Sequence, residues 1–93
     1  MVASTGAAVP TGFSPNNDGL NDYFYVLGHF SSYELRVFNE WGNQVFISND
    51  QSIKWDGTYK AKEQPAGTYI YIFNGKIIGG DDLKLNGEVN LIR

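Results

Sequence analysis

Residues 37–46 of this chain read Val-Phe-Asn-Glu-Trp-Gly-Asn-Gln-Val-Phe, and this stretch decides the class of fold. Strand-forming residues flank a short turn in which Gly42 or Asn43 can take a positive φ at little cost. Just upstream, apolar and polar side chains alternate over residues 33–39, which is the period-2 pattern of a half-buried strand. The sequence therefore predicts a β-hairpin whose strands are residues 33–39 and 44–48.

Other short strand signals lie on both sides of this hairpin. Residues 68–73 are all β-branched or aromatic, which predicts a central strand covered on both faces. Asn74-Gly75 is a type I′ turn signal leading into residues 76–78, and a further turn is expected at residues 79–82. The remaining expected strands are an edge strand at residues 9–13 that includes Pro10, an aromatic strand at 23–27, and a last strand at 83–92 that is broken near 86–87.

About seven short strands and no helical period favour an all-β fold. The predicted architecture is an immunoglobulin-like antiparallel β-sandwich, with an open barrel as the main alternative. A chain of 93 residues has room for one domain with a modest core, and aromatic residues make up 15% of it. Residues 1–8 are expected to be a flexible linker with an added initiator Met, and residues 9–93 the folded domain.

Composition excludes several classes of function. The chain has no cysteine, so disulfides, thiol nucleophiles and sulfur-ligated zinc are absent. A net charge of −3 without any basic run disfavours nucleic-acid binding. His29 has no acid or second ligand near it in sequence and is expected in a surface loop. Because no pattern of nucleophile, base or phosphate cradle stands out, the chain is predicted not to be an enzyme.

The loop from Ser14 to Asp22 raises the question of calcium. It follows part of the spacing of calcium-binding loops, in which side-chain or carbonyl oxygens alternate around a sharply turned glycine. With only two carboxylates such a site would be weak, and a turn whose Asn and Asp side chains bond to their own backbone is favoured over it. The calcium hypothesis, the only cofactor considered, names as ligands Asn16, Asp18, Leu20 and Asp22.

Two tryptophans have alternative interpretations. Trp41 and Trp55, with the exposed tyrosines, are candidates for a ligand-stacking platform like that of a carbohydrate-binding module. A small domain is short of buried apolar area, which favours the interpretation that both rings close the ends of the core.

The C-terminal stretch is a different kind of candidate. Val89 and Leu91 alternate with polar residues, and the chain ends on Leu91-Ile92-Arg93. The stretch is predicted to complete a sheet, and a partner can also capture such a strand by adding along its edge.

Five stretches, taken in order, resemble the type B C-terminal sorting domain of the type IX secretion system. This family occurs at the end of gliding-motility-associated and other large surface proteins of Bacteroidetes. The stretches are GFSPNNDGLNDYF (12–24), VFNEWGNQVF (37–46), WDGTY (55–59), PAGTY (65–69) and GEVNLIR (87–93). Their structural motif residues are Trp41, Gly42, Trp55, Asp56, Gly57, Pro65, Gly67 and Tyr69. The Trp-Asp-Gly and Pro-Ala-Gly-Thr-Tyr pattern is also similar to the immunoglobulin-like domain of the flagellar hook-capping protein, which supports the sandwich but no flagellar role.

The resemblance implies a non-enzymatic secretion signal. A passenger would cross the inner membrane by a separate N-terminal signal, be recognised in the periplasm through this domain, and reach the cell surface or the medium. The implied partners are the type IX machinery and an outer-membrane protein of the PorP/SprF-like kind. The predicted recognition residues are Val89, Leu91, Ile92 and Arg93 of the last strand and Asn16, Asn17, Asp18 and Asp22 of the front loop. The alternatives are a carbohydrate-binding module and a structural spacer of a surface adhesin.

Overall fold

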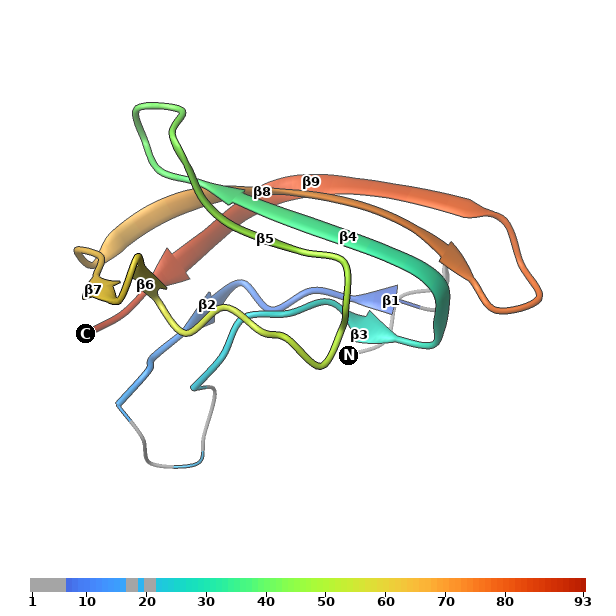
Figure 1. Ribbon diagram of the computed structural model, residues 1–93, viewed down its shortest axis with the longest axis horizontal. Coiled ribbons are helices and arrows are strands. Elements are labelled where there is room, and N and C mark those ends of the chain that lie inside the picture. The colour runs from blue at the N-terminus through green and yellow to red at the C-terminus, as the bar shows by residue number, and fades with distance from the viewer. Residues whose placement is uncertain (1–6, 17–18, 20–21) are drawn as a thin grey trace.

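The computed structural model describes residues 7–16, 19 and 22–93, and strands joined by turns and extended connections make up this part of the chain (Figure 1). The all-β prediction is confirmed, because none of the described residues is helical. The strands are β1 (Ala7–Ala8), β2 (Gly12–Phe13), β3 (Leu27–Gly28), β4 (Phe30–Phe38), β5 (Gln44–Ser48), β6 (Thr58–Tyr59), β7 (Lys62–Glu63), β8 (Gly67–Ile77) and β9 (Asp82–Leu91).

Five of these strands form one curved sheet in the order β2-β9-β8-β4-β5. The pairings β4–β5, β4–β8 and β8–β9 are antiparallel, as predicted, and short turns join β4 to β5 and β8 to β9. The pairing of β2 with β9 is parallel instead, with Gly12 opposite Asn90 and Phe13 opposite Leu91. It departs from the antiparallel prediction because a segment from the start of the chain lies beside the last strand, with no hairpin to reverse its direction.

A second layer lies under the concave side of the sheet in Figure 1. It contains the antiparallel pair β1–β3 and the extended connections around Phe24 and Trp55. The backbones of Phe24 and Trp55 exchange two hydrogen bonds, of 2.8 and 3.0 Å. Two layers closed over one core are compatible with the predicted β-sandwich.

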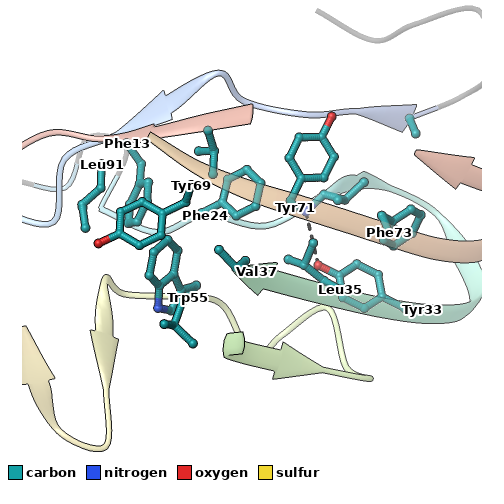
Figure 2. Close-up of a cluster of buried hydrophobic side chains, with 14 residues drawn as sticks. Phe13, Phe24, Tyr33, Leu35, Val37, Trp55, Tyr69, Tyr71, Phe73 and Leu91 are labelled. Carbon is teal, nitrogen blue, oxygen red and sulfur yellow. Dashed lines mark hydrogen bonds between the residues drawn. The ribbon is translucent and has the colours of Figure 1, made fainter. Parts of the chain in front are cut away.

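Aromatic side chains fill the space between the layers (Figure 2). The Trp55 ring packs against Phe13 and Tyr69, with ring centroids 5.2 and 5.1 Å away. The buried Tyr33 hydroxyl accepts a hydrogen bond from the Val26 N–H at 3.2 Å, which satisfies a buried donor of the second layer. The core residues are Ala7, Phe13, Phe24, Val26, Tyr33, Leu35, Val37, Val45, Trp55, Tyr69, Tyr71, Phe73, Val89 and Leu91.

The hairpin predicted from residues 33–48 is confirmed as β4 and β5. Tyr33, Leu35 and Val37 are buried on the inner face, as the alternation predicts. Gly42 takes the positive φ of the turn, +83°.

Strand β8 is central, as predicted, but it is covered on one face only. Tyr69, Tyr71 and Phe73 point into the core, whereas Ile70 and Ile72 are exposed on the outer face. The prediction of cover on both faces is wrong because the second layer closes one side of the sheet and no element lies over the other among the described residues.

The turn predicted at Asn74-Gly75 is also wrong. Strand β8 continues to Ile77, and Gly75 pairs with both Tyr33 and Leu83. A Cβ on Gly75 would come within 2.5 Å of the Phe73 ring, so glycine is needed here for close packing rather than for a turn. The actual turn follows Ile77 and overlaps the turn expected at residues 79–82.

Three further expectations about strands need correction. The edge strand predicted at residues 9–13 is real but is limited to β2, and residues 23–27 contribute only the Phe24 bridge and the start of β3. Strand β9 runs through residues 86–87 without a break. At the N-terminus, residues 1–6 of the expected linker lie outside the described residues, and Ala7–Ala8 form β1.

Candidate functional site

The C-terminal stretch places its apolar side chains inside the protein. Val89 and Leu91 are buried in the core, whereas Ile92 is 56% exposed. The Asn90 N–H donates to the Thr11 carbonyl and the Ile92 N–H to the Phe13 carbonyl, both at 2.9 Å. Of the residues predicted for recognition here, Ile92 therefore presents its side chain to solvent, while Val89 and Leu91 fix the strand.

Arg93 fastens the end of the chain to the connection between Trp55 and β8. Its Nε donates to the Gln64 carbonyl at 2.7 Å, and its Nη2 donates to the Gly57 carbonyl at 2.8 Å. Its Nη1 lies 3.0 Å from Oε2 of Glu63. We call these three contacts the Arg93 latch. The Arg93 side chain is 25% exposed and that of Glu63 77%, so the two carbonyl contacts carry most of the stabilisation.

An unpredicted hairpin supplies two partners of the latch. Strands β6 and β7 are joined by Lys60 and Ala61, whose φ angles of 53° and 65° are those of a type I′ turn. No sequence signal predicts this turn, because neither residue favours a positive φ. The hairpin brings Glu63 and Gln64 back beside Gly57, where the Gln64 N–H donates to the Gly57 carbonyl at 2.9 Å.

Gly57 is enclosed by the same group of residues. Its φ is +84°, and a Cβ there would lie 3.0 Å from Arg93 Nη2, 3.2 Å from Pro15 Cγ and 3.3 Å from Leu91 Cδ1. Beside it, Asp56 Oδ1 accepts hydrogen bonds from the N–H and the hydroxyl of Thr58. The Trp-Asp-Gly motif is thus a tight turn against which the C-terminus is packed.

The front loop approaches this same end of the chain. Asp22 and Tyr23 line a hollow of about 210 Å³ together with Asp56, Glu63 and Arg93. The structure thereby brings together two segments that the sequence predicted separately, the loop at residue 22 and the C-terminal Arg93. We use the name terminal surface for the residues around this hollow together with the exposed Ile92. The residues around the hollow are Pro15, Asp22, Tyr23, Asp56, Thr58, Glu63 and Arg93.

Two of the four residues named for calcium, Asp18 and Leu20, lie outside the described residues. Asn17, predicted for recognition only, lies outside them too. Asp22 Oδ2 accepts a hydrogen bond of 2.8 Å from the Gly19 N–H, and the Asn16 N–H donates to the Ser14 carbonyl. These are contacts of the kind expected for an Asx-rich turn. Residues 7–16, 19 and 22–93 contain no cluster of three or more His, Asp or Glu side chains suited to a metal ion.

The two tryptophans have opposite environments. Trp55 is 1% exposed and its Nε1 donates to the Thr58 carbonyl at 2.9 Å, so its predicted core position is confirmed. Trp41 is 73% exposed, and its predicted core position is wrong. It sits in the turn between β4 and β5, which projects beyond the sheet in Figure 1.

The Pro-Ala-Gly-Thr-Tyr motif leads into β8 and is fixed by its own tyrosine. The Tyr69 hydroxyl donates to the Pro65 carbonyl at 2.6 Å while its ring is buried. Burial raises the pKa of Tyr69. Gly67 has a φ of +152° at the first position of the strand. His29, at the other end of the molecule, is exposed between β3 and β4, as predicted.

Comparison with known proteins identifies the type of domain. The family model of the CHU_C type IX secretion signal domain matches residues 7–87. No curated protein matches this chain. No helix able to cross a membrane occurs in the part of the chain that the structure describes.

Proposed function

Because this chain belongs to the CHU_C family of type IX secretion signal domains, we propose that it is a non-enzymatic signal that directs an attached passenger to the cell surface. The family match carries this proposal, since it covers the domain from β1 into β9. The signal acts by protein–protein recognition in the periplasm and at the outer membrane. Its partners are the type IX machinery and an outer-membrane protein of the PorP/SprF-like kind, and the passenger precedes the domain.

Recognition is assigned to the terminal surface. The Arg93 latch orders the chain end against the turn at Gly57, so a partner meets a preformed shape and not a loose tail. Ile92 offers an exposed apolar side chain near Gly12, and the carboxylates of Asp22, Asp56 and Glu63 line the hollow beside Arg93. Protein interfaces combine apolar and charged groups of these two kinds.

Strand β9 offers a second means of contact at the same edge of the sheet. Its neighbour β2 pairs only with Asn90 and Leu91, so residues 82–89 have no strand beside them on that side among the described residues. Unpaired backbone groups of this kind accept an added strand from a partner. This supports capture of the last strand without exposing its buried side chains.

A carbohydrate platform built on both tryptophans is less well supported. Such a platform needs two accessible rings, and Trp55 is enclosed between Phe13 and Tyr69. Of the two tryptophans only Trp41 is available for stacking, and the tyrosines exposed in the described part of the chain are Tyr23 and Tyr59. The match to a family of secretion signals favours the signal over a structural spacer.

The test is export of a reporter. The full chain is fused after a periplasmic signal and a fluorescent passenger in a type IX-competent host, and passenger outside the outer membrane is measured. Export that disappears without the type IX machinery is the expected result. Retention in the periplasm, with the PorP/SprF-like partner supplied, would refute the function.

Variants of the same fusion test the terminal surface. Ile92→Asp changes an exposed side chain and should reduce export while the domain stays folded, as checked by the urea midpoint. Deletion of residues 91–93 is less informative if export falls, because Leu91 is part of the core. Unchanged export after that deletion would nevertheless show that the last strand is not recognised.

A further inference from the structure

The most exposed large apolar side chain in the described part of the protein is Trp41, which lies in a turn held by hydrogen bonds. Asn39 Oδ1 accepts hydrogen bonds from the N–H groups of Trp41 and Asn43, at 3.0 and 2.9 Å. The Gly42 N–H donates to the Asn39 carbonyl at 3.0 Å, and the Asn39 N–H to the Asn43 carbonyl at 2.9 Å. Four hydrogen bonds within five residues hold the turn, so little backbone freedom remains to be lost when the indole is buried by a partner.

Exposure of the Trp41 ring withholds apolar area from the core, and a domain of this size has little such area to spare. Burial of an aromatic side chain is a main source of stability for a small core, and Trp55 is used in that way. Trp41 is 73% exposed and adds little buried area to the core, yet four hydrogen bonds hold its turn. Tryptophan on a rigid protrusion is the side chain most often found as an energetic centre of protein interfaces.

A small groove lies directly beside the ring. Residues 39–41 of the hairpin form one wall and residues 65–69 the other, and the enclosed volume is about 90 Å³. The hydrogen bond from the Tyr69 hydroxyl to the Pro65 carbonyl fixes the second wall. The two family motifs, Trp-Gly and Pro-Ala-Gly-Thr-Tyr, thus meet across one groove although they are more than twenty residues apart in sequence.

The dimensions and chemistry of the groove favour a protein as its occupant. A volume of about 90 Å³ gives room for one aliphatic side chain beside the indole. Two of its polar groups are already engaged: Asn39 Oδ1 accepts two hydrogen bonds and the Tyr69 hydroxyl donates one. A sugar site needs free polar groups that converge on the hydroxyls. Glu40 on the rim favours a positively charged residue opposite.

We propose that Trp41 and the groove between residues 39–41 and 65–69 form a second docking site, at which a protein of the export machinery inserts an aliphatic side chain beside the indole and places a basic residue near Glu40. This inference rests on the proposed function and adds a contact outside the terminal surface. The indole packs against the partner's apolar surface, and its N–H is available to a partner carbonyl.

The test compares two exposed apolar residues in the export assay. Trp41→Ala should reduce export of the full-chain fusion by about tenfold or more, the effect of losing an interface centre. Ile78→Ala, at a 62% exposed position in the turn between β8 and β9, is the matched control and should be exported like the wild type. Both variants should keep the wild-type urea midpoint, because neither side chain is buried.

The outcomes separate this inference from the proposed function. Wild-type export with normal export of Trp41→Ala would refute the docking site alone. Retention of the wild-type fusion would refute the function, and the docking site with it. Quenching of tryptophan fluorescence by added oligosaccharides, lost in Trp41→Ala, would also overturn the inference and assign the ring to a glycan.

Discussion

Alanine at Gly57 should destabilise the domain more than alanine at Gly42, although both glycines have nearly the same φ, +84° and +83°. A left-handed backbone conformation costs a non-glycine residue about 1–2 kcal/mol, and this cost is common to Gly57→Ala and Gly42→Ala. At Gly42 nothing lies within 4 Å of the added Cβ, so about 1–2 kcal/mol is the whole expected effect.

At Gly57 the added methyl group meets three neighbours. Arg93 Nη2, Pro15 Cγ and Leu91 Cδ1 would lie at 3.0, 3.2 and 3.3 Å, and the guanidinium would have to move from its 2.8 Å contact with the Gly57 carbonyl. Overpacking of this kind adds about 1–3 kcal/mol. We therefore expect a total of about 2–5 kcal/mol for Gly57→Ala, the sum of the two ranges.

Urea unfolding of both variants measures the difference. The midpoint should fall further for Gly57→Ala than for Gly42→Ala, with equal slopes m, because the surface exposed on unfolding is nearly unchanged. In the background of Arg93→Ala the cost of Gly57→Ala should shrink, since one clashing group is gone. Equal midpoints for the two glycine variants, or no coupling with Arg93, would refute the argument that the C-terminus is packed on this turn.

Three further predictions concern stability. Arg93→Ala should lower the free energy of unfolding by about 2–4 kcal/mol, measured with urea, because two charge-assisted contacts to carbonyls are lost. Glu63→Gln should change it by no more than about 0.5 kcal/mol, because that carboxylate is mostly exposed. Trp55→Ala should cost about 3–5 kcal/mol and is expected to leave the domain partly unfolded at 37 °C, measured by near-UV circular dichroism. Burial raises the pKa of Tyr33. The stabilisation of the folded state by the neutral Tyr33 hydroxyl is therefore complete below about pH 10 and is lost as the pH rises through the pKa of the folded state. Tyr33→Phe, which leaves the buried Val26 N–H unpaired, should lower the urea midpoint at pH 7 and weaken the dependence on alkaline pH.

The features that the sequence predicted well are local ones. The alternation at Tyr33, Leu35 and Val37 and the positive φ at Gly42 depend on neighbours a few residues away, and both are present in the structure. The burial of Trp55 also follows from the shortage of core in a small domain.

The failures come from residues with two possible uses. Gly75 follows Asn74 as in a type I′ turn, but here the missing Cβ makes room for the Phe73 ring. Trp41 lies beside a glycine turn as Trp55 does, but its turn projects past the end of the sheet. Local pattern cannot separate these uses, because they differ only in what packs against the residue from elsewhere in the chain.

The candidate site shows the same division. The motifs were recognisable as five ordered stretches, and the family match from residue 7 to residue 87 covers the first four of them. Two parts of the site could not be predicted from the sequence. They are the contacts of Arg93 with backbone carbonyls and the hairpin at residues 58–63. A single arginine and a turn of Lys60-Ala61 favour no particular structure.

The sequence by itself determined the all-β class, the central hairpin and the secretion-signal family, because strand periodicity and turn chemistry are encoded in short contiguous stretches. Only the tertiary structure decided which tryptophan is buried and where the chain end is held. Arg93 and Gly57 are 36 residues apart in sequence, and Trp41 faces a groove whose other wall begins at Pro65. Contacts between segments so far apart in sequence depend on how the layers pack over a shared core, which is a property of the whole chain and of no single segment of it.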